Sequence, residues 1–221
     1  YQIATARTFI GTTEHRVGPT AIGCRDNPHG KTFTANPGNE RICLVKADPR
    51  QRGLFGAAWM LGYVASLAPT GVEAISFGAP TGPLGIIHRR GDSPVPYYDD
   101  ATAAASAAST GYPAFHVFAG LARASGAARV QVTSSDDAAL RCLAYRTKGA
   151  TLLWLANATA SKQELRVAHQ GRDPFGIVLD EASFARATTD PAGFQADTRP
   201  LELSRLVLGA YAVALVCVTD R

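Results

Sequence analysis

Asp48–Leu67, DPRQRGLFGAAWMLGYVASL, is the clearest helical signal in the chain. Asp48 is a favourable N-cap residue, and Pro49 suits the first helical position because its missing N–H would be unpaired there in any case. Apolar side chains then recur at helical spacing and form one face: Leu54, Phe55, Ala58, Trp59, Leu61, Ala65 and Ala68. We predict a helix over Pro49–Leu67, with Gly71 ending the unit.

A strand-like segment lies on each side of this helix. Arg16–Cys24 precedes it and Val72–Phe77 (VEAISF) follows it. A second helix is predicted over Tyr112–Ser125, and the alanine-rich stretch Ala101–Ser109 also favours a helix. Strands that alternate with helices are typical of a parallel sheet or barrel.

From residue 127 onward the pattern changes to short apolar segments separated by turn residues. Segments of this length and spacing predict an antiparallel β-sandwich. The strands we predict are Arg129–Thr133, Ala139–Tyr145, Thr151–Ala156, Gln163–Val167, Gly176–Leu179, Ser183–Ala187 and Ala210–Val218. We therefore expect two domains, 1–126 and 127–221. Trp59, Trp154 and His116 are interpreted as packed core residues.

Two strands and two long helices cannot close a barrel, because an eight-stranded barrel takes about 200 residues or more. We expect the chain to be the C-terminal part of a longer protein, or to pair with a missing piece. Its partner would be the N-terminal part of the barrel or another subunit, because open strand edges promote association.

Composition excludes several classes of partner. The chain of 221 residues is 46% hydrophobic and 18% charged, which is typical of a globular protein. Its longest apolar run, Leu54–Leu67, is shorter than the ~18 residues of a membrane span. The net charge of +4 is scattered, with the densest cluster at His88-Arg89-Arg90, so neither nucleic acid nor membrane is expected as a partner.

The four cysteines are Cys24, Cys43, Cys142 and Cys217, and no two of them form a CxxC pair. This spacing favours neither a zinc cluster nor a disulfide framework, and it fits a reducing, cytoplasmic compartment. We expect no metal and no cofactor.

Three segments together resemble one family. VGPTAIGCRDNP, from Val17, is similar to its V-S/G-P-T-x-L/I-x-x-R-x-N-P pattern. DPRQRGLFGAAWMLG is similar to its D-x-R-Q…F-G-A-A-W-T-L-G pattern, and VEAISFGAPTGPLGII occupies the place of its last barrel strand. The chain thus resembles the C-terminal portion of the D-apionate lactonases. The resemblance implies the end of a TIM (β/α)8 barrel followed by an antiparallel β-sandwich, with Arg16–Cys24 as strand seven and Val72–Phe77 as strand eight.

In such barrels the functional groups gather where the strands end. This rule places Arg25, Asp26, Asn27 and His29 at the mouth after strand seven, and Thr81 after strand eight. We predict that they contact a polyhydroxylated substrate, with Arg25 and Asn27 donating hydrogen bonds to its oxygens. An ordinary turn shaped by Asn27 and Pro28 is the alternative.

Arg50 and Gln51 also lie near the mouth, because their helix begins after the loop that follows a strand. We predict that they too bind substrate. The alternative is that Asp48, Arg50 and Gln51 only cap the helix and form a salt bridge.

The resemblance implies a hydrolase that opens a small aldonolactone, similar to apionolactone, by attack of water. The family often has a Glu near the end of strand eight, in Y-E-T-x-G-W-x-G, whereas this chain has Phe77-Gly78-Ala79-Pro80. The catalytic base is not identified here and is expected upstream of Tyr1. A retaining glycosidase, which needs two carboxylates, and an inactive carbohydrate-binding fragment are the alternatives.

Overall fold

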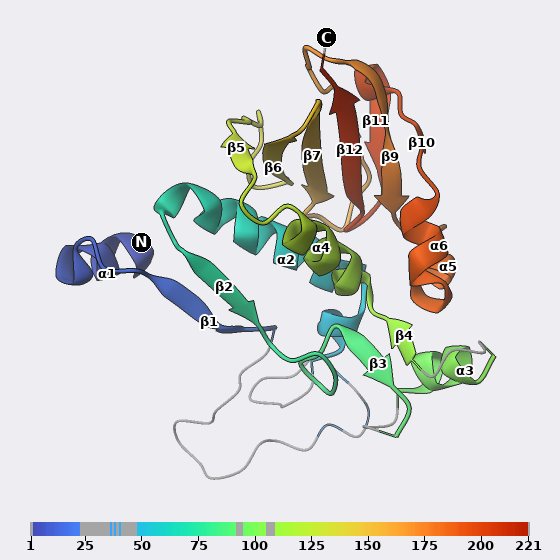
Figure 1. The fold of residues 1–221 in the computed structure, drawn as a ribbon. Coiled ribbons are helices and arrows are strands. Elements are labelled where there is room, and N and C mark those ends of the chain that lie inside the picture. The colour runs from blue at the N-terminus through green and yellow to red at the C-terminus, as the bar shows by residue number, and fades with distance from the viewer. Residues whose placement is uncertain are drawn as a thin grey trace.

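The computed structural model describes residues 2–22, 36, 38, 40, 48–91, 95–104 and 109–220 (Figure 1). Within these residues no helix has the length and apolarity needed to cross a membrane.

The first half of the chain contains a βαβ unit, which follows a short N-terminal helix. Strands β1 and β2 pair in parallel, with Arg16 opposite Ala74 and Val17 opposite Ile75. The prediction of two parallel strands joined through a helix is confirmed. The elements are α1 (Gln2–Ile10), β1 (Arg16–Thr20), η1 (Pro49–Arg52), α2 (Leu54–Leu67), η2 (Ala68–Thr70) and β2 (Ala74–Phe77).

The predicted helix over Pro49–Leu67 is divided in two. Asp48 caps the 3-10 turn η1 as expected, because its carboxylate accepts from the Arg50 N–H at 2.9 Å. The chain then becomes extended at Gly53 and re-enters a helix at Leu54. Gly56 allows this change of direction, since a Cβ there would lie 2.6 Å from the Gln51 carbonyl oxygen.

An insertion follows β2 and was not foreseen as a hairpin. Strands β3 (Ile87–Arg89) and β4 (Ser109–Gly111) pair antiparallel, with α3 (Pro96–Ala104) between them in the chain. The helix predicted over Ala101–Ser109 is therefore misplaced, because α3 begins earlier and Ser109 already belongs to β4. The chain then forms α4 (Pro113–Arg123), as predicted.

The second half is built on a six-stranded sheet of order β10-β9-β12-β7-β6-β5, in which every neighbouring pair is antiparallel. A two-stranded sheet of β11 and β8 packs against one of its faces. The elements are β5 (Ala128–Val130), β6 (Leu140–Thr147), β7 (Ala150–Asn157), β8 (Gln163–Leu165), β9 (Arg172–Leu179), α5 (Phe184–Thr189), α6 (Pro191–Ala196), β10 (Arg199–Pro200), η3 (Leu203–Arg205), β11 (Leu206–Leu208) and β12 (Val213–Thr219).

The strand predicted over Ser183–Ala187 is wrong, because this segment begins α5. Ser183 closes a turn after β9: its N–H donates to the Asp180 carboxylate at 2.9 Å, and its hydroxyl accepts from the Asp180 N–H at 2.8 Å. This turn directs the chain into a helix, in which the Ala187 N–H donates to the Ser183 carbonyl.

The main core lies between the helices α2 and α4 and the large sheet. In Figure 1, α2 and α4 lie between the β1–β2 pair and the six-stranded sheet. Leu61, Val117 and Trp154 meet there and are almost fully buried. The Trp154 indole donates to the Tyr145 hydroxyl at 3.0 Å, and the Nε2 of His116 lies 2.9 Å from the Ala187 carbonyl oxygen. Trp154 and His116 are core residues, as predicted.

Gly120 provides a test of this interface, because a Cβ there would overlap the ring of Trp154. We expect Gly120→Ala to lower the free energy of unfolding by about 1–3 kcal/mol, since overpacking outweighs the gain in helix propensity. Urea denaturation measures the change. Gly209→Ala, where a Cβ meets no atom within 4 Å, is the matched control. Equal stabilities of the two variants would contradict tight packing between Gly120 and the Trp154 ring.

Candidate functional site

The candidate site lies at the carboxyl ends of β1 and β2. The Gly78 N–H donates to the Thr20 carbonyl at 2.9 Å, so both strands end at the same level. The chain leaves β1 through Ile22, which is buried. The predicted substrate residues Arg25, Asp26, Asn27 and His29 follow directly, and they lie outside the described residues. Their role stays a prediction.

Gln51 joins the two segments that leave the strands. Its Oε1 accepts from the Ile22 N–H at 3.1 Å, and its Nε2 lies 3.5 Å from the Gly85 carbonyl oxygen. The side chain is 3% exposed. This amide therefore holds the loop after β1 against the loop after β2, and it places Gln51 beside the mouth.

Arg50 and Asp48 form the ion pair that the sequence offered as the alternative to substrate binding. The Nε of Arg50 donates to Asp48 Oδ1 at 2.9 Å, and its Nη2 donates to Oδ2 at 2.6 Å. Asp48 is 2% exposed, whereas the Arg50 side chain is 31% exposed. Hydrogen bonding to Asp48 raises the pKa of Arg50, so the guanidinium keeps its charge. The capping and salt-bridge interpretation is confirmed, and substrate contact by the exposed part of Arg50 stays a prediction.

Thr81 is exposed and lies on the loop between β2 and β3. The loop is tightened by Gly82, whose φ is +80°, and by the Gly85 N–H, which donates to the Gly82 carbonyl at 3.0 Å. A Cβ at Gly85 would lie 2.5 Å from the Thr81 backbone. Thr81 therefore stands at the same end of the strands as Gln51.

A buried histidine in the insertion was missed at the sequence level. His88 Nε2 lies 2.8 Å from Asp99 Oδ1, and His88 Nδ1 lies 3.2 Å from the Tyr112 hydroxyl. His88 is 2% exposed. Because both ring nitrogens are already engaged and solvent is excluded, His88 in this geometry holds β3, α3 and the start of α4 together rather than acting as a base. The sequence showed His88 only as part of a basic cluster.

Tyr98 connects this histidine to the mouth. Its ring packs against those of His88 and Tyr112, and its hydroxyl donates to the Arg52 carbonyl of η1. Burial raises the pKa of Tyr98 well above its usual range, so the hydroxyl remains a donor. The insertion is thereby fixed to η1 next to Gln51. No spacing rule in the sequence signals this contact, since Tyr98 and Arg52 are far apart in the chain.

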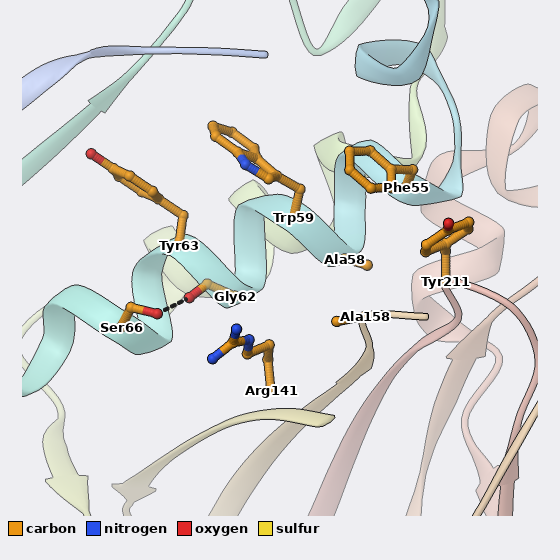
Figure 2. A pocket seen from close by; sticks show the side chains of 9 residues that line it. All are labelled: Phe55, Ala58, Trp59, Gly62, Tyr63, Ser66, Arg141, Ala158 and Tyr211. Atoms are coloured by element: carbon orange, nitrogen blue, oxygen red, sulfur yellow. Dashed lines mark hydrogen bonds between the residues drawn. The ribbon is translucent and has the colours of Figure 1, made fainter. Parts of the chain in front are cut away.

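A pocket of about 310 Å³ lies along α2 on the side facing the large sheet (Figure 2). Its floor is made of Ala58 and Gly62, and aromatic side chains and one arginine surround it. The residues that line it are Phe55, Ala58, Trp59, Gly62, Tyr63, Ser66, Arg141, Ala158 and Tyr211. Trp59, predicted as core, is partly buried here and stacks on Tyr63 with ring centroids 5.4 Å apart.

Two family models match the chain. The model of the D-apionate lactonase TIM barrel domain matches residues 1–126, and that of the D-apionate lactonase C-terminal immunoglobulin-like domain matches residues 137–216. The chain belongs to the D-apionate lactonase family. Its fold class is the one predicted: the last strands and helices of a TIM barrel, followed by an antiparallel β-sandwich.

Comparison with individual proteins agrees with this family. The D-apionate lactonase of Brucella anthropi is 27% identical over 176 residues, which are 78% of this chain and 26% of that protein. The chain thus spans about a quarter of the length of this relative. A conserved exported protein from Bacteroides fragilis matches in structure with a TM-score of 0.60 and 12% identity, over 98% of this chain and 41% of that one. At this identity the likeness concerns the fold alone.

The end of β2 carries no carboxylate, because the chain continues there as Phe77-Gly78-Ala79-Pro80. A Cβ at Gly78 would lie 2.2 Å from the Leu84 carbonyl oxygen. A side chain at Gly78 therefore has no room. Within the described residues no group of three or more His, Cys, Asp or Glu side chains is arranged to hold a metal.

The His88–Asp99 pair predicts a pH dependence of stability. The Val95 N–H, then the hydrogen bond and charge of His88, and the charge of Arg90 lower the pKa of Asp99. A lowered pKa in the folded state means that the stabilisation is present above the unfolded pKa, near 3.8, and is lost as pH falls through the folded value. We expect Asp99→Asn to remove this acid-dependent loss, which sets in as the pH falls below about 4.

Urea denaturation of the wild type and Asp99→Asn at pH 6 and pH 3 measures the effect. Asp100→Asn changes the neighbouring exposed carboxylate and is the matched control. If Asp99→Asn and the wild type lose equal stability on acidification, the pair does not contribute as described.

Gln51 predicts a second effect on stability. We expect Gln51→Ala to lower the free energy of unfolding by about 1–3 kcal/mol, because the buried Ile22 N–H loses its acceptor. Denaturation in urea measures the loss, and Arg89→Ala on the exposed end of β3 is the control. A Gln51→Ala variant as stable as this control would show that the contact does not hold the loops.

Proposed function

We propose that the protein is a hydrolase that opens a small aldonolactone, similar to apionolactone, by attack of water on the ring carbonyl. Membership of the D-apionate lactonase family over both domains is the observation that carries this proposal. The position of Gln51, Arg50 and Thr81 at the carboxyl ends of β1 and β2 supports it, because TIM-barrel enzymes bind their substrates at this face.

The proposed reaction requires a base and hydrogen-bond donors in the site. Water adds to the lactone carbonyl as a base takes its proton, and the carbonyl oxygen becomes an oxyanion. The ring C–O bond then breaks, the leaving alkoxide takes a proton, and the product is an open-chain aldonate. Arg25 and Asn27 would donate to the oxyanion, and Arg50 would bind an oxygen of substrate or product. The base remains unassigned.

The proposal is tested with the protein at its full natural length, assayed on sugar lactones and on aryl glycosides. We expect lactone hydrolysis, with kcat lowered about 100-fold in Arg25→Ala and in Asn27→Ala, because each would remove a donor to the oxyanion. Glu14→Ala is the control, since Glu14 is exposed at the opposite end of β1 and forms an ion pair with the exposed Arg16.

Each contrary outcome has a distinct meaning. Hydrolysis of aryl glycosides without lactone opening would replace the lactonase by a glycosidase. Wild-type rates in both loop variants would remove Arg25 and Asn27 from the mechanism. Binding of sugars without turnover of either substrate class would favour a carbohydrate-binding role.

We further propose that the β1–β2 pair joins additional barrel strands, supplied by an N-terminal part of the barrel or by another subunit. Among the described residues, β1 and β2 pair only with each other, so their outer edges offer free backbone donors and acceptors. We expect the 221-residue chain by itself to associate or precipitate. Size-exclusion chromatography with calorimetry measures this, and a monodisperse, cooperatively melting monomer would contradict it.

A further inference from the structure

Tyr211 has an unusual backbone conformation in the immunoglobulin-like domain. It precedes β12 and has a φ of +54°, in the left-handed region that favours glycine. Two backbone hydrogen bonds hold this turn: the Tyr211 N–H donates to the Thr159 carbonyl at 3.1 Å, and the Ala212 N–H donates to the Gly209 carbonyl at 3.1 Å. A tyrosine in this conformation suggests that its side chain is needed where the turn places it.

The ring of Tyr211 reaches across to the barrel domain. It meets the ring of Phe55 edge to face, with centroids 5.2 Å apart and an interplanar angle of 79°. Figure 2 shows the two rings next to each other, one from α2 and one from the turn before β12. This geometry is the favoured one for an aromatic pair, so each ring restricts the other.

The ring of Phe55 also contacts the side chain of Arg50. The guanidinium carbon of Arg50 lies 5.4 Å from the centre of the Phe55 ring, within the range of a cation–π contact. Asp48 holds the Nε and Nη2 atoms of the same guanidinium. No described residue forms a hydrogen bond to Arg50 Nη1 within the usual distance. Asp48 thus holds one edge of the Arg50 guanidinium, and the Phe55 ring lies against one of its faces. The Nη1 atom can still donate a hydrogen bond to another group.

We propose that Tyr211 is a positioning residue for Arg50, acting through Phe55, and that the immunoglobulin-like domain thereby shapes the substrate site. The proposal deepens the proposed function and rests on it, because the group that Arg50 would meet is an oxygen of the lactone or the carboxylate of the aldonate. The chemistry fits, since a fixed planar guanidinium binds carboxylate oxygens with little loss of side-chain freedom.

Substitutions at Tyr211 separate the ring from the backbone. Tyr211→Gly removes the ring and relaxes the left-handed backbone, so the turn itself stays compatible with the fold. Tyr211→Phe keeps the ring and should restore the wild-type behaviour. Val207→Ala, at an exposed position of β11 in the same domain, reports any general effect of changing a surface side chain.

Two readouts are taken on the full-length protein. The first is the rate at which phenylglyoxal modifies Arg50, followed by mass spectrometry, which needs no activity. The second is the division of the kinetic effect between KM and kcat on a sugar lactone. In Tyr211→Gly we expect faster labelling of Arg50 and a KM raised about threefold to fivefold with kcat nearly unchanged, as for loss of a partly exposed cation–π contact.

A double-mutant cycle tests the route through Phe55. Phe55→Leu keeps an apolar side chain but removes the aromatic face, and should give the same faster labelling of Arg50. If Tyr211 acts through Phe55, adding Tyr211→Gly to Phe55→Leu changes the labelling rate little further. Fully additive effects would show that Tyr211 does not act through this ring.

The outcomes separate this inference from the proposed function. A lower melting temperature of Tyr211→Gly with unchanged Arg50 labelling would reduce Tyr211 to a structural role and overturn the inference. If Tyr211→Gly does not fold, Tyr211→Leu, which also removes the aromatic ring, is labelled in its place: faster modification of Arg50 is expected, and an unchanged rate would overturn the inference. If the wild type opens no lactone but Tyr211→Gly still speeds the labelling of Arg50, then Tyr211 does position Arg50 and the proposed function is wrong.

Discussion

The packing of α2 and α4 against the six-stranded sheet is the contact on which the rest of the molecule depends. Gly120 of α4 lets the Trp154 ring approach the helix backbone, and Leu61 and Val117 fill the space beside it. Because α2 begins directly after η1, whatever fixes α2 also fixes Arg50 and Gln51 at the end of β1. The sandwich therefore determines the position of groups at the barrel mouth without itself lying there.

The mouth is held together by polar side chains that span separate segments. Gln51 joins the end of β1 to the loop after β2, and Tyr98 joins the insertion to η1. The ring of His88 packs against that of Tyr98, and its two nitrogens lie within hydrogen-bond distance of Asp99 and Tyr112. These are buried groups whose hydrogen-bonding capacity is used internally, so they set the shape of the site. The Arg50 side chain, by contrast, remains 31% exposed beside them.

The prediction from sequence was most accurate where a signal is local. The Asp48 cap, α2, α4 and most of the sandwich strands follow from side-chain periodicity and capping, which are properties of neighbouring residues. It was wrong at Ser183, because a single side chain–backbone turn with Asp180 redirects the chain from a strand into a helix. It also missed the β3–β4 hairpin, whose two short strands are separated by α3 and carry no alternating pattern.

The sequence by itself determined the order β1, α2, β2 and α4, most strands of the sandwich and, through its motifs, the family to which the chain belongs. It also placed Arg50 and Gln51 near the mouth, because a helix that follows a strand-end loop must begin there. Only the tertiary structure decided how these side chains are used: that Asp48 holds Arg50, that Gln51 links two loops, and that Tyr211 reaches Phe55 from the other domain. The physical reason is that each of these contacts joins side chains whose meeting depends on how η1 turns, how the loops run and how α2 packs against the sheet.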